Sequence, residues 1–376
     1  MYNKQKAEQT RAGDGSDSAE STVTEDVLVS EENMNVLPDI KNMVAVNYAD
    51  KGAPEVAVKK IGILTSGGDA PGMNAAIRAV VRCAVQAGIE VFGITRGYHG
   101  LWKGEFMPLT TRDVSEKLQR GGTFLMTARS KTFSQPEGVM KAVKMCRVFE
   151  LDAVVVIGGD GSYRGARDLA RVGVPVICMP GTIDNDIAST EYTIGYDTAM
   201  NTAMEAIDKL RDTASSHERC SVIEVMGRSA GYIALNVGIA TGAEVVLIPE
   251  QQCDFNRDVV RVLLDCRNQK KKHYIVVVAE GAGHATEIAA QIEEMTGIEA
   301  RPTILGHLQR GGSPTLRDRT MASLMGSRAV QCMTDGRLNR VISYSAGAFT
   351  DIDIEEALQM TKTISKAQLD EFRLFN

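Results

Sequence analysis

Three short apolar runs, each followed by a loop rich in glycine or aspartate, limit what this chain can fold into. The runs cover residues 61–64, 152–157 and 174–179. Their β-branched residues and their Gly or Pro boundaries are typical of buried strands. Helical periodicity follows the first two loops, from Met73 onward and over residues 164–171. Strands that alternate with helices predict a parallel α/β sheet, with an active site in the loops at the carboxyl ends of its strands.

The same alternation is predicted to continue in βα fashion to the end of the chain. At 376 residues, with 44% hydrophobic and 24% charged content, the chain has room for two domains. Helices are predicted over residues 197–210, 231–240, 256–268 and 287–296, and strands over 221–225, 245–248, 274–279 and 303–305.

Residues 1–56 differ in character from the rest of the chain. They are rich in acidic and small polar residues and have no sustained hydrophobic period, which predicts a disordered acidic extension. They lack the apolar core of a signal peptide, and no run anywhere in the chain is apolar enough to cross a bilayer. The formal charge of -6 gives no general attraction to nucleic acid or to an anionic membrane. Seven cysteines without a Cys-x-x-Cys pair argue against a disulfide framework or a zinc ribbon, so we expect a cytoplasmic protein.

Two of the glycine loops have the composition of phosphate-binding loops. They read TSGGDAPG over residues 65–72 and GGDGS over residues 158–162, and each lies between a predicted strand and a predicted helix. Their backbone amides can approach an anion closely, although neither loop is a dinucleotide fingerprint or a P-loop. Asp160 would lie beside the phosphates, where magnesium is normally held by one or two carboxylates and phosphate oxygens. The alternative is a Gly-Asp turn that binds nothing.

The third loop, PGTIDND over residues 180–186, carries the residues best suited to catalysis. If residues 182–186 are extended, Thr182, Asp184 and Asp186 lie on one side and Asn185 on the other. A hydroxyl and two carboxylates so placed suit a reaction that removes a proton from a substrate hydroxyl beside a metal or anionic group. The alternative is a capped turn, which the loop taken alone slightly favours.

Arginines near predicted strand ends indicate a second anion site. Arg219, Arg228, Arg301 and Arg310 suit bidentate phosphate contacts. Each arginine taken singly is more often a surface ion pair, and only their grouping at strand ends favours an anion site. His307 fits a substrate contact or an ordinary loop histidine equally well.

From about residue 59 to residue 330 the chain resembles the bacterial ATP-dependent 6-phosphofructokinases. Five motifs carry the resemblance in family order: the loops over 65–72, 158–162 and 180–186, then MGR over 226–228 and GHLQRGG over 306–312. The resemblance implies two similar three-layer α/β domains with mainly parallel sheets, in a homotetramer whose active sites are shared between subunits. An ATP-binding domain would cover residues 57–195 plus 309–359, and a fructose 6-phosphate-binding domain residues 196–308 plus 360–376.

The resemblance also implies a role for each matching residue. Asp184 would be the base on the sugar 1-hydroxyl, with Thr182 and Arg228 at the transferring phosphoryl group. Mg²⁺ would be held by Asp160. The residues implied for ATP are Gly68, Arg129, Ser130, Gly159, Asp160, Gly161 and Ser162. The residues implied for the sugar phosphate are Asp186, Met226, Gly227, Glu280, His307 and Arg310, with Arg219 and Arg301 from a neighbouring subunit.

An effector site for ADP or phosphoenolpyruvate is implied as well. Arg78 and Arg82 are four residues apart on a predicted helix and lie off its apolar stripe. The resemblance groups them with Arg211, Glu244, Lys271 and Lys272. Two solvated arginines are the competing explanation, because Thr111 and Gln269 replace basic residues of the family's effector site.

Three other functions compete with ATP-dependent phosphorylation. A pyrophosphate-dependent phosphofructokinase would usually carry Asp at position 161 and Lys at position 181, where this chain has Gly161 and Gly181. A kinase of another substrate would not share both the Asp184 loop and the Arg310 segment. A non-catalytic regulatory subunit would be signalled by loss of Asp184, Asp160 or Arg228, and all three are present.

Overall fold

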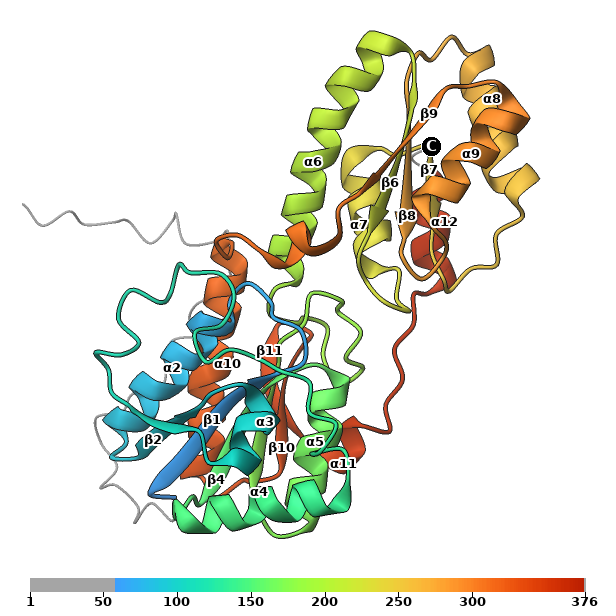
Figure 1. Cartoon of the computed structure of the whole chain (residues 1–376). Helices are drawn as coiled ribbons and strands as arrows, with labels where there is room; N and C mark the ends of the chain where they lie inside the picture. Colours follow the sequence, from blue (N-terminus) through green and yellow to red (C-terminus); the bar gives the residue numbers. More distant parts are fainter. Residues whose placement is uncertain (1–57, 375–376) are drawn as a thin grey trace, which may run out of the picture. The chain divides into compact units, whose positions relative to one another are not determined.

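The computed structural model of this chain describes residues 58–374 and contains two β-sheets (Figure 1). The predicted disordered extension over residues 1–56 lies outside the described residues. The first sheet has seven strands in the order β11-β10-β5-β4-β1-β2-β3, and the second has four in the order β7-β8-β6-β9. No helix of residues 58–374 is both long enough and apolar enough to span a membrane.

The seven-stranded sheet is covered by helices on both faces. Alternate residues of a strand point to opposite faces, so Ile61 and Ile63 of β1 pack toward α2 and α10, whereas Leu64 packs toward α3, α4 and α5. Gly326 of α10 allows close helix packing, because a Cβ there would lie 2.6 Å from the Cβ of Ala79 on α2. The strands are β1 (Lys60–Ser66), β2 (Glu90–Ile94), β3 (Phe106–Leu109), β4 (Ala153–Gly158), β5 (Val176–Pro180), β10 (Arg340–Ser345) and β11 (Ala348–Asp353). The helices are α2 (Met73–Gln86), α3 (Gly97–Lys103), α4 (Pro136–Val148), α5 (Asp160–Arg171) and α10 (Leu316–Thr334).

The four-stranded sheet is built in the same way, and all of its strands are parallel. Ile223 and Val225 of β6 pack toward α6 and α7, while Val222 packs toward α8 and α9. The strands are β6 (Cys220–Val225), β7 (Val245–Leu247), β8 (Tyr274–Ala279) and β9 (Ala300–Ile304). The helices are α6 (Tyr196–His217), α7 (Tyr232–Thr241), α8 (Arg261–Asn268) and α9 (Ala285–Thr296). The predicted fold class, three-layer α/β with mainly parallel sheets, is confirmed, and the exact domain bounds stay a prediction.

Several element predictions were wrong in detail. The βα alternation does not continue to the chain end, since β10 and β11 form an antiparallel hairpin. Its two-residue turn places Ala346 and Gly347 at φ 49° and 81°, the geometry of a tight hairpin turn. Strand β3 also runs antiparallel to β2. The helix predicted over 256–268 is a π-helical segment, η2 (Asn256–Val260), followed by α8, and α5 begins at Asp160, so residues 160–162 are its first turn rather than a loop. The remaining elements are η3 (Gly306–Arg310), α11 (Ile354–Ala357) and α12 (Lys366–Leu374).

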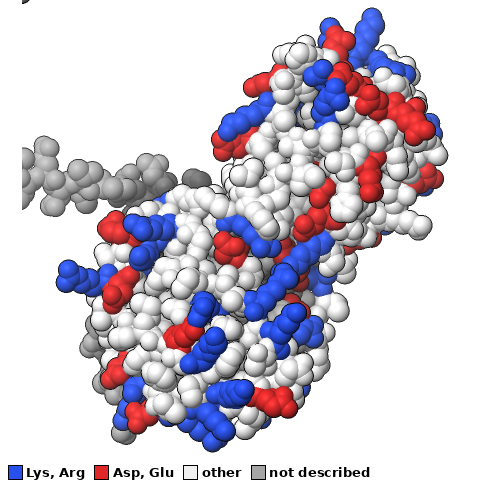
Figure 2. All heavy atoms as spheres, in the orientation of Figure 1, with Lys and Arg blue, Asp and Glu red and all other residues white. Residues whose placement is uncertain are grey.

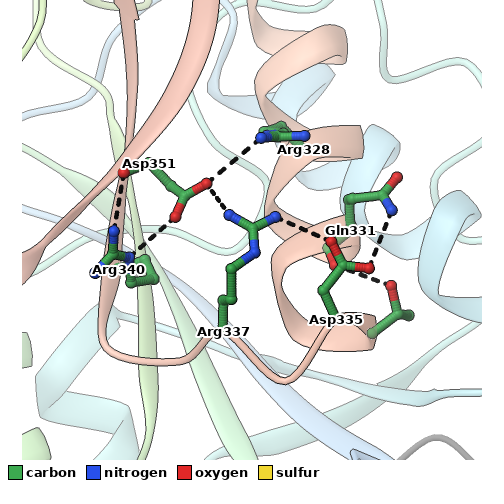
Figure 3. A network of polar contacts seen from close by, with 7 residues as sticks. Arg328, Gln331, Asp335, Arg337, Arg340 and Asp351 are labelled. Atoms are coloured by element: carbon green, nitrogen blue, oxygen red, sulfur yellow. Dashed lines mark hydrogen bonds and ion pairs between the residues drawn. The ribbon is translucent and has the colours of Figure 1, made fainter.

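A polar cluster fastens the hairpin to α10 (Figure 3). Asp351 of β11 has a side chain only 5% exposed and lies among three arginines. Arg340 Nε of β10 is 3.0 Å from Asp351 Oδ2, Arg328 of α10 is 3.5 Å from Oδ1, and Arg337 also pairs with Oδ1. Because β10 pairs with β5, this cluster holds the edge of the sheet next to the strand that leads into the 180–186 loop.

Candidate active site

The carboxyl ends of β1, β4 and β5 lie side by side. Their register pairs Ser66 with Gly158, and Gly158 with Pro180. Ser162 Oγ donates a hydrogen bond to the Ser66 carbonyl at 3.0 Å, and Gly181 N donates to the Gly158 carbonyl at 3.0 Å. The three loops singled out from the sequence therefore meet at one edge of the seven-stranded sheet.

A pocket of about 720 Å³ opens at this edge. It is lined by six basic side chains and three acidic ones: Arg129, Lys131, Arg164, Arg167, Arg228 and Arg310 against Asp69, Asp168 and Asp184. This excess of positive charge is local, because Figure 2 shows Lys and Arg interspersed with Asp and Glu over the visible face. A strongly anionic ligand is what such a pocket attracts.

Most residues predicted for ATP line this pocket, namely Gly68, Arg129, Ser130, Gly159, Gly161 and Ser162. Asp160 does not line it, and its carboxylate is paired with Arg164 Nε at 2.9 Å. A Cβ added to Gly161 would meet no atom within 4 Å, whereas one added to Gly181 would lie 2.8 Å from Ile157 Cγ2. Gly161 thus leaves open space in the pocket, while Gly181 is required by packing.

Aromatic residues that the sequence did not single out form part of the pocket wall. The rings of Tyr98 and Phe133 stack with centroids 4.1 Å apart, and both residues line the pocket. Tyr98 Oη donates to the Ser162 carbonyl at 2.6 Å. Trp102 Nε1 donates to Ser130 Oγ at 3.2 Å. These residues lie outside the glycine and acidic motifs, so no local sequence signal marked them.

The 180–186 loop is not extended, which corrects the expected alternation of its side chains. Asn185 has φ 50°, in the left-handed region that Asn tolerates better than most residues. Thr182 and Asp184 nevertheless meet, because Thr182 Oγ1 donates to Asp184 Oδ2 at 3.0 Å. Asp184 is buried and Asp186 is half-buried. A bend at Asn185, rather than a strand period, sets the directions of the two carboxylates.

Asp184 has one carboxylate oxygen held and the other left free. Its side chain is 2% exposed, and Arg228 Nε lies 3.3 Å from Oδ2. Oδ1 is buried and has no hydrogen-bond partner among the described residues. Burial raises the pKa of Asp184. Arg228 and the Thr182 hydroxyl lower it, but they offset only part of this increase. Oδ2 is therefore fixed in place, whereas Oδ1 keeps its capacity to accept a hydrogen bond.

Two arginines of the pocket, Arg228 and Arg310, follow strands of the four-stranded sheet. Arg228, at φ 54°, follows β6, and its amide donates to Glu280 Oε1 at 2.7 Å. Gln309 Oε1 accepts from Met226 N at 2.8 Å, a supporting contact that the sequence did not assign although Gln309 lies in the 306–312 motif. Arg310 lies against the first glycine loop, since a Cβ on Gly68 would be 3.0 Å from its Nη1.

The four predicted anion-site arginines do not gather in one chain. Arg219 precedes β6 and Arg301 lies near the start of β9, at the amino ends of these strands, whereas Arg228 and Arg310 follow carboxyl ends. Arg219 Nε is 2.8 Å from Glu299, and Arg301 pairs with the same carboxylate. Within one chain the four arginines are separated because they lie at opposite ends of the strands, so a site that combines them stays a prediction. His307 is exposed on η3.

The residues predicted for an effector fall into two sets. Arg78 and Arg82 lie half-buried and exposed on α2, away from its buried stripe. The other four lie near the amino ends of β7 and β8 and already have protein partners. Lys271 pairs with Glu244, Lys272 Nζ is 3.0 Å from Glu218, and Arg211 donates to the Thr241 carbonyl.

The acidic residues at this edge fit a magnesium ion that arrives with phosphates. Within residues 58–374, no group of three His, Cys, Asp or Glu forms a ready metal site. Burial raises the pKa of Asp186, and the carboxylates of Asp184 and Asp160 raise it further, which places three carboxylates in one electrostatic neighbourhood. Mg²⁺ usually takes one or two carboxylates together with phosphate oxygens.

Comparison with known proteins points to one family. The family model described as phosphofructokinase matches residues 60–333. The chain is 53% identical over 314 residues to the ATP-dependent 6-phosphofructokinase of Clostridium botulinum (strain Eklund 17B / Type B), covering 83% of this chain and 97% of that one. It is 53% identical over 313 residues to the ATP-dependent 6-phosphofructokinase of Clostridium acetobutylicum, covering 83% and 98%.

Solved structures give the same likeness. Phosphofructokinase from Saccharomyces cerevisiae matches with a TM-score of 0.76 and 34% identity, over 84% of this chain and 48% of the yeast chain. This chain thus spans about half the length of that structure's chain. The pyrophosphate-dependent phosphofructokinase from Marinobacter aquaeolei matches with a TM-score of 0.75 over 85% of this chain and 91% of that one, and at 19% identity it supports the fold alone.

Proposed function

This chain belongs to the phosphofructokinase family, and we propose that it transfers a phosphoryl group from ATP to the 1-hydroxyl of fructose 6-phosphate, giving fructose 1,6-bisphosphate. The observation that carries the proposal is the buried Asp184 with its free Oδ1, in a pocket built from three phosphate-type loops and two converging arginines. Phosphoryl transfer depends mostly on positioning and charge neutralisation, so this set of groups is sufficient without a covalent nucleophile.

Asp184 acts as the general base in this proposal. Its Oδ1 accepts the proton of the sugar hydroxyl, while Thr182 and Arg228 hold Oδ2 and keep the carboxylate oriented. Thr182 and Arg228 also contact the transferring phosphoryl group, and the guanidinium offsets the negative charge there. Glu280 and Gln309 act through the backbone by fixing the Met226 to Arg228 segment.

The donor is ATP. Gly68 and Gly159 let the backbone approach the phosphates, and Arg129, Ser130, Gly161 and Ser162 complete the pocket. The open space at Gly161 and the names of the 53% identical relatives favour ATP over pyrophosphate. Asp160 would hold Mg²⁺, with Asp184 and Asp186 nearby, and the bound ion would neutralise phosphate charge.

The sugar phosphate is bound by groups from two subunits. Asp186, Met226, Gly227, Glu280, His307 and Arg310 come from one subunit, and Arg219 and Arg301 come from its neighbour in a homotetramer. The position of Arg219 and Arg301 at the opposite ends of β6 and β9 supports a role outside their own chain's pocket. We further propose that Arg78 and Arg82, with Arg211, Glu244, Lys271 and Lys272, bind ADP or phosphoenolpyruvate between subunits. The seven free cysteines are compatible with a reducing cytoplasm.

A coupled assay tests the proposal. Purified protein is given fructose 6-phosphate and magnesium with either ATP or pyrophosphate, and fructose 1,6-bisphosphate is measured. Turnover with ATP well above that with pyrophosphate is expected. Faster turnover with pyrophosphate would reject the donor, and no turnover with either donor would favour a non-catalytic subunit.

A further inference from the structure

A lysine far from every motif contacts the back of the catalytic loop. Lys362 lies between α11 and α12, and its Nζ donates to the Asn185 carbonyl at 2.8 Å and to the Thr190 carbonyl at 2.9 Å. The same ammonium lies 4.9 Å from the centroid of the Tyr232 ring. One side chain therefore joins the loop that carries Asp184 to the first residue of α7.

A hydrogen bond to the Asn185 carbonyl affects the direction of the residue that follows it. Asn185 is in the left-handed region at φ 50° and separates Asp184 from Asp186. The orientation of its carbonyl fixes the peptide plane that leads into Asp186, so a donor on this oxygen fixes the direction of that carboxylate. The bend is costly for a residue with a Cβ and persists where surrounding contacts hold it.

The contact with Tyr232 connects Lys362 to the segment that carries Arg228. Tyr232 begins α7, four residues after Arg228, whose guanidinium lies beside Asp184. A cation over an aromatic face is attracted by the ring quadrupole and gains strength where water is excluded. Lys362 thus contacts both the loop that carries Asp184 and the helix that follows Arg228.

The ammonium of Lys362 is half-buried near the carboxylates of Asp186 and Glu191. Burial lowers the pKa of Lys362 to about 8, while the carboxylates of Asp186 and Glu191 raise it in opposition. Asn185 and Thr190 are both buried, so the half-buried ammonium donates to two carbonyls on residues with little access to water. Its retention beside Asp186 points to a requirement for a fixed, positively charged donor.

We propose that Lys362 is a positioning residue for phosphoryl transfer, which holds the bend at Asn185 and so sets Asp184 and Asp186 relative to Arg228. This inference rests on the proposed function, since it assigns a role within the same reaction. It predicts that loss of the ammonium misplaces the base without removing any group that touches substrate.

Lys362→Met tests the role, with Lys366→Met as the matched control. Lys366 is exposed at the start of α12, four residues further along the chain. Small misplacements of catalytic groups cost up to about 100-fold in rate, so we expect kcat of Lys362→Met to fall about 10- to 100-fold with KM for ATP nearly unchanged. Lys362→Arg should recover part of the loss, and Lys366→Met should behave as wild type.

A merely structural role gives a different pattern. It would lower the thermal unfolding midpoint of Lys362→Met and leave kcat at wild-type values well below that midpoint, which would overturn the inference. Tyr232→Leu keeps the lysine but removes the ring, and it carries the test if Lys362→Met does not fold. In that variant an unchanged kcat would likewise count against the proposal.

Failure of the proposed function would appear in the wild-type protein, as absence of turnover with ATP. To test the positioning role independently of turnover, binding of fructose 6-phosphate is measured by calorimetry for the same proteins. Several-fold weaker binding to Lys362→Met than to Lys366→Met supports the positioning of Asp186, and equal affinities together with equal turnover contradict it.

Discussion

At the scale of single residues, Asp184 differs from the other acids of the site because its two carboxylate oxygens have different surroundings. Thr182 and Arg228 hold Oδ2, and Oδ1 has no partner among the described residues, so the proposed reaction assigns the substrate proton to Oδ1. Asp184→Asn keeps the shape and the hydrogen bond from Thr182 but removes the basic oxygen. We expect turnover to fall about 10²- to 10⁴-fold, the usual contribution of a general base, with binding of both substrates largely kept.

Saturation kinetics on purified Asp184→Asn protein check this expectation, with Asp186→Asn as the comparison. Asp186→Asn should lower turnover less, because Asp186 is assigned to sugar binding rather than to proton removal. Turnover of Asp184→Asn above a small fraction of wild type at saturating substrates would show that another group takes the proton.

Gly161 offers a second test at this scale, because we propose that donor choice depends on the room it leaves. A Cβ there meets no atom, so Gly161→Ala should fold normally and retain most ATP-dependent turnover. Gly161→Asp adds a carboxylate beside the phosphates, and its repulsion should raise KM for ATP by about tenfold or more. Initial rates over a range of ATP concentrations measure the change. Equal KM values for the Ala and Asp variants would remove Gly161 from donor choice.

At the scale of elements, the cluster around Asp351 links β10, β11 and α10. Burial opposes ionisation of Asp351, but hydrogen bonds from Arg337 and Arg340 outweigh it and hold the pKa of this carboxyl below its ordinary value of 3.8. Asp351→Asn leaves three arginines facing a neutral amide. Hydrogen bonds to charged groups contribute about 1.5–3 kcal/mol, so a loss of that order in the free energy of unfolding is expected at pH 7.

The sign of the pH dependence follows from the lowered pKa. The contribution of Asp351 is complete above the ordinary value of 3.8 and is lost as the pH falls through the lower folded value. Urea unfolding of wild type and Asp351→Asn should therefore show a gap that narrows in acid. Asp335→Asn is the control, because its partly exposed pair with Arg337 should contribute about 1 kcal/mol or less. A gap that stays constant from pH 7 to pH 3 would contradict the ion-pair explanation.

At the scale of the whole molecule, the position of Arg301 makes a prediction about assembly. Arg301 lies near the start of β9, away from the carboxyl ends that deliver Arg228 and Arg310. If its proposed substrate lies in a neighbouring subunit, Asp184→Asn and Arg301→Ala proteins are each nearly inactive. Hybrids of the two would contain some sites with both groups intact.

Mixing the two variants under conditions that exchange subunits should then restore activity well above the sum of the separate proteins. Wild type mixed with itself controls for losses during exchange. Activity that never exceeds the sum, in a preparation shown to contain hybrids, would place each complete site within one chain.

Local sequence patterns are enough to locate three strands of the seven-stranded sheet and the composition of the loops that follow them. Apolar period and glycine spacing are local properties, so they located β1, β4, β5 and the loops that follow them, and parallel pairing made those loops adjacent. The motifs also contain Asp184, Thr182 and Arg228, whose side chains the structure brings into contact.

The arrangement of these parts depends on contacts between segments that are far apart in the sequence. The bend at Asn185 is held by a lysine 177 residues away, and Tyr98 and Phe133 reach the pocket by packing that no local pattern specifies. The separation of Arg219 and Arg301 from Arg228 and Arg310 depends on which end of a strand faces the pocket. Contacts between distant segments depend on the packing of the whole core, whereas sequence periodicity records only which side chains share a face.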